Sequence, residues 1–577
     1  MSISKHRLKL LLWLILSLVF GGIVYAVVAG VAALAAYFQQ GADPAQALNI
    51  VPNKPPDLYV KLVWKPDDPD TGREMEPLTR RLIEGAYLRA WLQWNISHLR
   101  GQPYGLRTYF VGPTLDNVSE TVRRVANDGW HMTQVDTEHT LTLHFYSADG
   151  SIASFTDENI NIVQILEDEA GIQRLHEMTA TYDVVMFLED GNWRVRAWER
   201  RQARLLPNRL DPPHTDPLPG MVYAEGNRLM HDGKPFTVAG VNYYPADAPW
   251  SEFWTNYDAA TVETDLLRIE DLGLNTLRIF IPFETFGGPT VDPLMRARLR
   301  DFLDRAEAHG LKVIVTLFDF RNDYAPLLWP HADRHLDAIV EPLSRHPAIL
   351  AWDIKNEPDL DYEGTDPAIV NGWLTHVARR LRRLDPHHLI TIGWAHAENA
   401  DQLLDMVDVV SFHFYEDPAT LPDAYAALHQ RTTKPILLTE FGLSTWNSAF
   451  FPNGHTEAEQ AAYIADVLRG VYASDMSGFL VWTLYDFEHV PRSVFGWQPW
   501  RRFPQAHMGI LHSDGTPKPA AALVRPDAAL DAPAPTPWAR FFKPFWRSVY
   551  VVVVVGLFLL WRGARWWKRR RQRRMGL

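Results

Sequence analysis

The sequence predicts an α/β protein whose largest unit, residues 221–525, folds as an eight-stranded (β/α)8 TIM barrel. Two observations lead to this fold class. Strand-like runs alternate with amphipathic helical patterns, and the runs are apolar throughout rather than at every second position. Such strands are buried on both faces, as in a parallel sheet covered by helices. The sequence has no glycine-rich dinucleotide fingerprint and no phosphate loop, which disfavours a doubly wound sheet.

The predicted barrel contains eight strand-like runs, and helical patterns separate most of them. A short hairpin that turns at Asp232-Gly233 comes before the first run. The helical pattern is clearest in PLMRARLRDFLDRAEAHG, where apolar residues recur every three or four positions. In chain order, the strand-like runs are residues 236–244, 276–282, 312–319, 349–358, 389–394, 409–415, 436–442 and 478–486.

A smaller unit with an α+β pattern is predicted over residues 58–205. It begins with a long helical pattern that Gly101 ends. Two pairs of alternating strands follow, each joined by an Asp-Gly turn, at Asp149-Gly150 and Asp190-Gly191. A helix leaning on a curved antiparallel sheet resembles the cone-shaped NTF2-like domains. That resemblance carries no catalytic motif and implies a spacer, protein-contact or ligand-holding role.

The chain is predicted to cross a membrane twice. Residues 10–38 carry no charge over 29 positions, more than the roughly 20 that span a bilayer as a helix. A cleaved secretory signal is the alternative, since Ala33-Leu34-Ala35 could be cut, but the run is about twice a normal signal core. Residues 546–561 form the second predicted span, and their flanking Arg and Trp side chains suit the interface.

Positive charges flank both predicted spans, in residues 1–9 and in the basic tail 562–577, so we expect both termini in the cytoplasm. The small unit and the barrel would then lie outside. Because the chain has no cysteine, no disulfide supports them. Proline-rich segments are predicted to act as semi-rigid linkers between the units, at residues 39–57, 206–220 and 526–545.

The net charge and the composition indicate which classes of molecule the protein can bind. The net charge of −12 disfavours nucleic acid, and the basic tail is explained more simply by membrane topology than by nucleic-acid binding. The expected membrane partner is lipid, contacted through the two spans. The 22 Trp, 20 Tyr and 27 Phe residues suit stacking on sugars, although ordinary core packing explains them at least as well.

Two carboxylates stand where a barrel places its chemistry. Glu357 ends the fourth strand-like run and Glu440 ends the seventh, so both should face the mouth at the carboxyl ends of the strands. Paired carboxylates are what cleavage of a glycosidic bond needs. One holds a proton for the departing oxygen, and the other, ionised, attacks or stabilises the anomeric carbon. Different surroundings must separate their affinities for a proton.

Residues 221–525 resemble a retaining glycoside hydrolase of clan A, with family 5, the cellulase and mannanase family, as the nearest likeness. The motif DIKNEP matches the Asn-Glu-Pro signature of strand four, and LLTEFG matches the nucleophile of strand seven. The resemblance implies that Glu357 is the general acid/base and Glu440 the nucleophile. It also implies a covalent glycosyl-enzyme intermediate, net retention, and carboxyl groups about 5 to 5.5 Å apart.

The same resemblance assigns substrate-binding roles to five more residues. Arg278 would hold the nucleophile ionised, and Asn356 would bond the sugar 2-hydroxyl. Tyr415 would bond the nucleophile, His413 a hydroxyl, and Trp482 would form a stacking platform. Each residue alone has an ordinary explanation, as a barrel ion pair, a core histidine or packing, and their conjunction favours function.

Other positions are assigned less specifically. Alternation along the strand leaves open whether the residues around the signature face the helices or the loop: Asp353, Lys355 and Asp359. Position alone suggests further subsite residues: Tyr244, Asp319, Trp394, His396 and Trp446. His331 and His335 lie four apart without the glutamate that a zinc hydrolase needs, so we expect a solvated loop and helix start there. The predicted chemistry requires neither a metal nor an organic cofactor.

The sequence therefore predicts a β-glycoside hydrolase acting on a β-linked oligo- or polysaccharide. Transglycosylation is the nearest alternative, because it uses the same residues and differs only in whether water or a sugar reaches the intermediate. A second alternative is a catalytically silent carbohydrate-binding or scaffold protein of an envelope polysaccharide system, against which the intact Glu357 and Glu440 argue. A third alternative is that the two predicted membrane spans carry the main role of the protein, and that the basic tail binds anionic lipid or a cytoplasmic partner. The sugar, the linkage and endo or exo action are left open.

Overall fold

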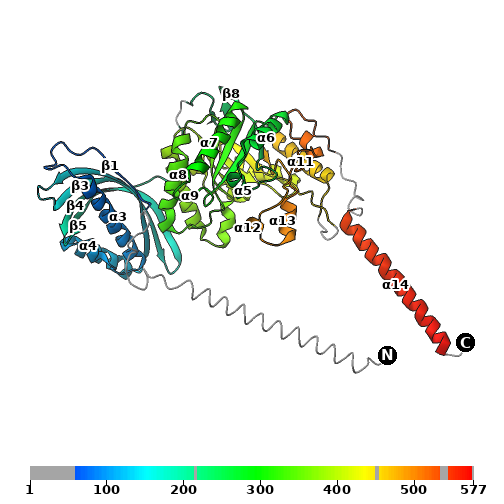
Figure 1. The fold of residues 1–577 in the computed structure, drawn as a ribbon, viewed down its shortest axis with the longest axis horizontal. Coiled ribbons are helices and arrows are strands. Elements are labelled where there is room, and N and C mark those ends of the chain that lie inside the picture. Colours follow the sequence, from blue (N-terminus) through cyan, green and yellow to red (C-terminus); the bar gives the residue numbers. More distant parts are fainter. Residues whose placement is uncertain (1–58, 214–216, 449–453, 533–542, 575–577) are drawn as a thin grey trace.

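The computed structural model describes residues 59–213, 217–448, 454–532 and 543–574. These residues form a small α+β domain, a barrel and a long C-terminal helix, as Figure 1 shows. The predicted N-terminal segment 1–9, the first predicted span 10–38 and the linker 39–57 lie outside the described residues.

The small domain packs two helices against one strongly curved sheet. Helix α3 (Pro77–Leu99) and helix α4 (Gly112–Asn127) accompany five strands in the order β1-β2-β3-β4-β5. The strands are β1 (Lys61–Trp64), β2 (His131–Tyr146), β3 (Ile152–Asp168), β4 (Gly171–Glu189) and β5 (Asn192–Leu205). The Asp-Gly turns join β2 to β3 and β4 to β5, and both turn glycines have positive φ. Helix α4 has no counterpart among the predicted elements, and the NTF2-like resemblance stays a prediction.

The barrel is closed by eight parallel strands, which confirms the predicted fold class. The hydrogen-bonded order runs from β10 through β16 and back to β9, each strand beside its sequence neighbour. Nearly every residue of these strands is buried, because helices cover the outside and side chains fill the inside. The strands are β9 (Val238–Asn242), β10 (Thr276–Pro282), β11 (Lys312–Asp319), β12 (Ile349–Asn356), β13 (Leu389–Trp394), β14 (Val410–His413), β15 (Ile436–Glu440) and β16 (Gly478–Val481).

Helices surround the barrel, and several begin at a side-chain cap. Asp258, Asp292 and Asp366 accept from the first-turn N–H groups of α6, α7 and α9, and Thr456 forms a capping box at α11. The longer helices are α6 (Ala259–Asp271), α7 (Pro293–Ala308), α8 (Trp329–Ile339), α9 (Pro367–Leu384), α10 (Leu421–His429) and α11 (Glu457–Ala473). Short helices lie at the mouth: α5 (Ser251–Thr255), α12 (Arg492–Phe495) and α13 (Pro499–Gln505).

A small antiparallel sheet closes the barrel at the end away from the mouth. It consists of β6 (Val222–Glu225), β7 (Arg228–His231) and β8 (Lys234–Pro235). Val222 and Leu229 pack with apolar side chains from the amino-terminal halves of the barrel strands, such as Leu350. The opposite end, where the strands finish, is therefore the end left open for chemistry.

The small domain docks on helices α8 and α9 of the barrel, beside which it lies in Figure 1. Glu177 on β4 accepts hydrogen bonds from Arg379 (2.5 Å) and pairs with His376 (2.9 Å), both on α9. The second ring nitrogen of His376 pairs with Asp333 on α8 at 2.9 Å. All four side chains are buried. The docking surface is therefore a network of buried charges in which every partner depends on the others.

Replacing Glu177 by alanine should destabilise this docking by about 3 to 5 kcal/mol, because the buried guanidinium of Arg379 would lose its carboxylate. Urea unfolding should show a lower midpoint, and proteases should cut more readily between residues 206 and 220. The exposed Glu169 on the β3–β4 turn gives a matched control, Glu169→Ala, with little effect. Equal unfolding curves for the two variants would contradict this assignment.

The docking should also depend on pH, with a sign that follows from Glu177. Burial by itself raises the pKa of this carboxyl, but His376 and Arg379 outweigh burial and lower the pKa from 4.5 to about 2. A depressed pKa in the folded state contributes stability above pH 4.5, and that stability is lost as pH falls toward 2. Acid should therefore weaken the native docking in this range and have less effect on Glu177→Ala.

Helix α14 (Pro544–Arg574) runs away from both domains in Figure 1. Its part from Pro544 to Trp566, 23 residues, is long and apolar enough to cross a membrane, and is the one such helix among the described residues. Its apolar side chains, including Val552 and Leu560, are exposed. The helix continues through the segment predicted as a separate basic tail, as far as Arg574.

Candidate active site

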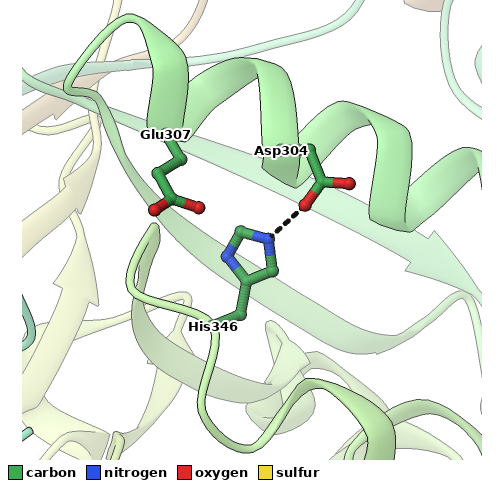
Figure 2. Close-up of side chains that lie close together, drawn as sticks. All are labelled: Asp304, Glu307 and His346. Carbon is green, nitrogen blue, oxygen red and sulfur yellow. Dashed lines mark hydrogen bonds and ion pairs between the residues drawn. The ribbon is translucent and has the colours of Figure 1, made fainter.

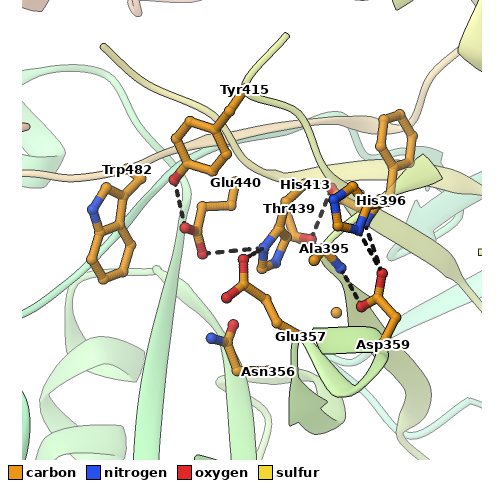
Figure 3. A network of polar contacts seen from close by, with 12 residues as sticks. Asn356, Glu357, Asp359, Ala395, His396, His413, Tyr415, Thr439, Glu440 and Trp482 are labelled. Atoms are coloured by element: carbon orange, nitrogen blue, oxygen red, sulfur yellow. Dashed lines mark hydrogen bonds and ion pairs between the residues drawn. The ribbon is translucent and has the colours of Figure 1, made fainter. Parts of the chain in front are cut away.

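Glu357 and Glu440 meet at the open end of the barrel, as Figure 3 shows. A carboxylate oxygen of each, together with a ring nitrogen of His413, lie within 4.8 Å of one another. Retaining glycosidases place their two carboxyl groups about 5 to 5.5 Å apart, whereas inverting enzymes need about 6.5 to 9.5 Å to admit a water. The observed spacing fits the retaining arrangement.

Glu440 is the more enclosed carboxylate, with a side chain 9% exposed. It is the last residue of β15, and donors surround it. The hydroxyl of Tyr415 donates to Oε1 at 2.5 Å, and Nη1 of Arg278 donates to Oε2 at 3.2 Å. Nδ1 of His413 lies 3.6 Å from Oε2. These contacts fix the carboxylate in one orientation, as a nucleophile requires.

Glu357 has a side chain 28% exposed and faces the mouth. Nδ1 of His413 lies 3.0 Å from its Oε1. The backbone of Glu357 has φ +49°, a left-handed conformation that is uncommon for a residue other than glycine. Pro358 disfavours the ordinary helical conformation at the residue before it, so the strand ends in this sharp turn. The turn directs the carboxyl across the mouth toward Glu440.

The two carboxyls influence each other's protonation. Burial raises the pKa of Glu440, and the negative charge of Glu357 raises it further. The contacts with His413, Arg278 and Tyr415 act to lower this pKa but do not outweigh the rise. Burial also acts to raise the pKa of Glu357, but the hydrogen bond and charge of His413 outweigh it and lower that pKa. Two carboxyls so close titrate as a coupled pair.

Arg278 organises the floor of the site and is fully buried. Besides Glu440, its guanidinium donates to Asp353 (2.7 and 3.0 Å), to Asn356 (2.8 Å) and to Asn242 (3.2 Å). Burial acts to lower the pKa of Arg278, yet the charges of Asp353 and Glu440 outweigh burial and raise it. The positive charge on the floor is therefore permanent.

Six of the seven predicted site residues form one connected set of contacts. Asn356 accepts from Arg278 through Oδ1, which leaves its amide N–H groups available to a ligand at the mouth. Trp482 follows β16 and lies beside this set in Figure 3. Its Nε1 donates to Gln505 at 3.3 Å, and its side chain is largely buried. The geometry brings the predicted residues together, and their individual roles stay predictions.

Comparison with known proteins gives the class of this site. Residues 311–529 match the family model described as glycosyl hydrolases family 2, TIM barrel domain. Mannan endo-1,4-beta-mannosidase A of Podospora anserina is 26% identical over 278 residues, which cover 38% of this chain and 72% of that protein. Mannan endo-1,4-beta-mannosidase A of Emericella nidulans is 24% identical over 315 residues, which cover 44% and 81%.

The chain is a glycoside hydrolase. Among solved structures, it is similar to the exo-beta-1,4-mannosidase Op5Man5 from Opitutaceae bacterium strain TAV5. That match has a TM-score of 0.44 and 21% identity, and covers 52% of this chain and 60% of the other. An endo-1,4-beta-mannanase from Rhizomucor miehei gives a TM-score of 0.37 and 18% identity, with 46% and 90% coverage.

The floor of the hydrolase site contains residues that the sequence pattern could not place with certainty. Asp353 is buried and accepts from Arg278, from Thr316 (2.8 Å) and from the backbone N–H of Gly393 (2.9 Å). Gly393 packs so closely that a Cβ there would lie 2.7 Å from Nη2 of Arg278. Both residues lie inside the barrel, where they position the guanidinium of Arg278 below the two carboxylates.

Replacing Asp353 by alanine should lower the stability of the hydrolase by about 3 to 5 kcal/mol, because the buried charge of Arg278 would lose its main partner. The expected result is a lower urea midpoint together with reduced activity, since Arg278 also holds Glu440. The exposed Asp423 on α10 provides the matched control, Asp423→Ala, which should unfold like the wild type. A wild-type midpoint for Asp353→Ala would contradict the proposed support.

The other positions named from the sequence lie in different surroundings. Tyr244 and Trp394 are buried, and the ring of Tyr244 stacks on Phe280. His396 is held by Asp359, whose carboxylate also accepts from backbone N–H groups. The expectation of a solvated segment around the two spaced histidines is wrong for His335. This side chain is fully buried on α8, where Nδ1 lies 2.8 Å from the carbonyl oxygen of Gly288.

A second group of possible metal ligands lies on the outside of the barrel. Figure 2 shows Asp304 and Glu307 on α7 next to His346, with ligand atoms within 4.8 Å of one another. Nε2 of His346 already pairs with Asp304 at 3.0 Å, and both carboxylates are exposed to solvent. The group is explained as a contact between the buried imidazole of His346 and the exposed carboxylate of Asp304, which joins α7 to the turn before β12.

Proposed function

We propose that this hydrolase is a membrane-anchored, extracytoplasmic, retaining β-glycosidase that acts on a β-linked oligo- or polysaccharide by double displacement. The observation that supports the proposal is the approach of Glu357 and Glu440 to within 4.8 Å at the barrel mouth, with donors fixed on Glu440. Because the relatives named above are β-mannosidases, β-1,4-mannan is the first substrate to test.

In the first step Glu440 attacks the anomeric carbon of a sugar bound between the two carboxyls. The bond from this carbon to the glycosidic oxygen breaks, and Glu357 gives its proton to that oxygen. The product is a glycosyl ester on Glu440 and a free sugar hydroxyl. Asn356, with its amide N–H groups at the mouth, is placed to bind a sugar hydroxyl during this step.

In the second step Glu357, now ionised, takes a proton from water as the water oxygen attacks the anomeric carbon. The ester bond breaks and Glu440 departs as a carboxylate. Arg278 and Tyr415 already donate to its two oxygens. These preorganised donors stabilise the negative charge that forms on Glu440 as the ester bond breaks. Two inversions at one carbon give net retention. If a sugar hydroxyl replaces water, the same residues perform transglycosylation.

The test is the full chain in detergent with aryl β-glycosides, β-mannans and β-glucans. We expect hydrolysis of at least one β-linked substrate, with the first-formed product in the β configuration by NMR. A first product of α configuration would contradict the retaining mechanism. Transfer products in place of hydrolysis would assign a transglycosylase, and binding without turnover of any substrate would favour a scaffold protein.

The membrane part of the proposal rests on the apolar helix from Pro544 to Trp566, on the uncharged run 10–38, and on positive charge at both chain ends. The two ends would lie in the cytoplasm and both domains outside. In intact cells or spheroplasts, added protease should digest the barrel while tags on both termini survive. Protection of the barrel, or its release from membranes by high salt alone, would contradict this topology.

A further inference from the structure

A pocket of about 730 Å³ lies at the barrel mouth, and Asp319 in its wall is close enough to Glu357 and Glu440 to be influenced by their charges. Most of its walls come from residues that follow β9, β10, β11 and β16, such as Ser251, Glu284, Arg321 and Ser493, and Tyr59 from the segment before β1 also lines it. The volume falls in the range of about 300 to 1,000 Å³ that is usual for ligand sites. Since Glu357 follows β12 and Glu440 ends β15, this pocket occupies one of the two arcs of the mouth that the carboxyls separate.

Two charged side chains in the pocket wall have polar atoms without a partner. Asp319 is 4% exposed and Arg321 is 7% exposed. Within the described part of the chain, Oδ2 of Asp319 and both Nε and Nη2 of Arg321 make no hydrogen bond. Buried polar atoms in native proteins are normally satisfied, because leaving them unpaired is costly. An acceptor and two donors are thus available to a ligand in this pocket.

Phe320, between these two residues, adds an apolar surface. This residue is 51% exposed and lines the same pocket. The backbone at Phe320 has φ +60°, which is a genuine outlier for a bulky aromatic residue. Such outliers persist where the surrounding structure holds them, and they cluster at ligand sites. The guanidinium of Arg321 is itself fixed over the ring of Phe283, at 4.3 Å.

The charges around the pocket indicate what kind of ligand fits. Three carboxyl groups, those of Glu284, Asp319 and Asp323, line it together with one guanidinium. His331 adds no positive charge near neutrality, because burial lowers its pKa. Burial raises the pKa of Asp319 to about 7, against the opposing charges of Lys355 and Arg278. Glu284 and Asp323 outnumber the one guanidinium without Asp319, so an anionic ligand would be repelled. Neutral hydroxyls, in contrast, can both donate to a carboxyl and accept from a guanidinium.

We propose that Asp319, Phe320 and Arg321 form a subsite for a neutral sugar unit, next to the unit whose bond is cleaved. Oδ2 of Asp319 accepts from one hydroxyl, the free N–H groups of Arg321 donate to a hydroxyl oxygen, and the ring of Phe320 supports the apolar face of the sugar. This proposal rests on the proposed function and extends it, because it requires a substrate of at least two sugar units.

The first experiment compares aryl β-glycosides of one, two and three sugar units, of the sugar that the wild type cleaves. We expect the wild-type kcat/KM to rise with length. Arg321→Gln should raise KM for the longer substrates about tenfold or more, with a smaller effect on kcat, so that the gain with length is lost. Arg321→Lys, which keeps the charge without the planar fork, should recover part of it.

The matched control is Arg296→Gln, which removes an exposed guanidinium from α7 outside the mouth and should keep the wild-type dependence on length. Asp319→Asn gives a second test if Arg321→Gln unfolds at a lower temperature than this control. Retention of the wild-type gain with length in both Arg321→Gln and Asp319→Asn would overturn the proposal.

A binding arm separates failure of this proposal from failure of the proposed function. The full-length Glu440→Gln variant is titrated calorimetrically with mannotetraose and with cellotetraose, with and without Arg321→Gln. The proposal expects binding of at least one probe that Arg321→Gln weakens about tenfold, even if the wild type proves to have no turnover. Equal binding with and without the second substitution, or no binding of either probe, would overturn it.

Discussion

Replacing Glu440 by alanine should remove almost all hydrolysis, with kcat falling by a factor on the order of 10⁵. The variant has no group to form the glycosyl ester, while Arg278 and Tyr415 would still present their donors to the vacated space. The measurement is release of an aryl alcohol from an aryl β-glycoside, with the unfolding midpoint recorded beside it.

Azide distinguishes loss of the nucleophile from loss of the fold. A small anion can occupy the space left by the carboxylate and attack the anomeric carbon from the same side, so Glu440→Ala with sodium azide should regain part of its rate and yield the α-glycosyl azide. The matched control, Glu307→Ala, removes an exposed carboxylate from α7 and should retain wild-type activity. Near-normal hydrolysis by Glu440→Ala without azide would contradict the assignment of the nucleophile.

Replacing Glu357 by alanine should give a loss that depends on the leaving group. General acid catalysis contributes about 10² to 10⁴-fold, so substrates with sugar or other basic leaving groups should slow by that factor. An activated leaving group such as 2,4-dinitrophenolate needs no proton, and its first step should slow little. The measurement is kcat/KM for a series of aryl glycosides with leaving groups of increasing pKa.

The pH profile of the wild type should have two limbs, because catalysis needs one proton on the coupled pair. Activity falls at low pH as the pair gains a second proton, and at high pH as the pair loses its only one. In Glu357→Ala the alkaline limb should disappear for activated substrates, since the acid that causes it is absent. An unchanged alkaline limb, or an equal loss for all leaving groups, would argue that Glu357 is not the acid.

The barrel was predictable because its strands are buried on both faces, which gives continuous apolar runs that periodicity alone can detect. The meeting of the two carboxylates was predictable for a related reason. A parallel barrel gathers the residues at the ends of its strands, so Glu357 and Glu440 had to share one mouth although 83 positions separate them.

Alternation along β12 could not place Asp353, and the structure gives the physical cause. The register of β12 against β13 shifts between Asp353 and Asn356. Both side chains contact Arg278, although residues three apart on a regular strand point to opposite faces. A bulge of this kind leaves no trace in the pattern of apolar residues.

The docking of the small domain on the barrel could not be predicted from the sequence either. Glu177 lies in a strand whose alternation indicates only which face is buried, and His376 looks like an ordinary residue of an amphipathic helix. These two residues are 199 positions apart in the sequence, and nothing in the sequence pattern pairs them. Which surfaces of two domains meet depends on their shapes, and those exist only after each has folded.

The glycine at position 393 limits which residues of this enzyme can change when its substrate specificity changes. Arg278 and Asp353 fill the space where even one methyl group would sit. Random mutagenesis should therefore recover altered sugar preference from the rim, around Arg321, while the innermost layer tolerates almost no change. Substrate specificity in related enzymes should therefore change through residues at the rim of the mouth, while the residues packed around Gly393 stay the same.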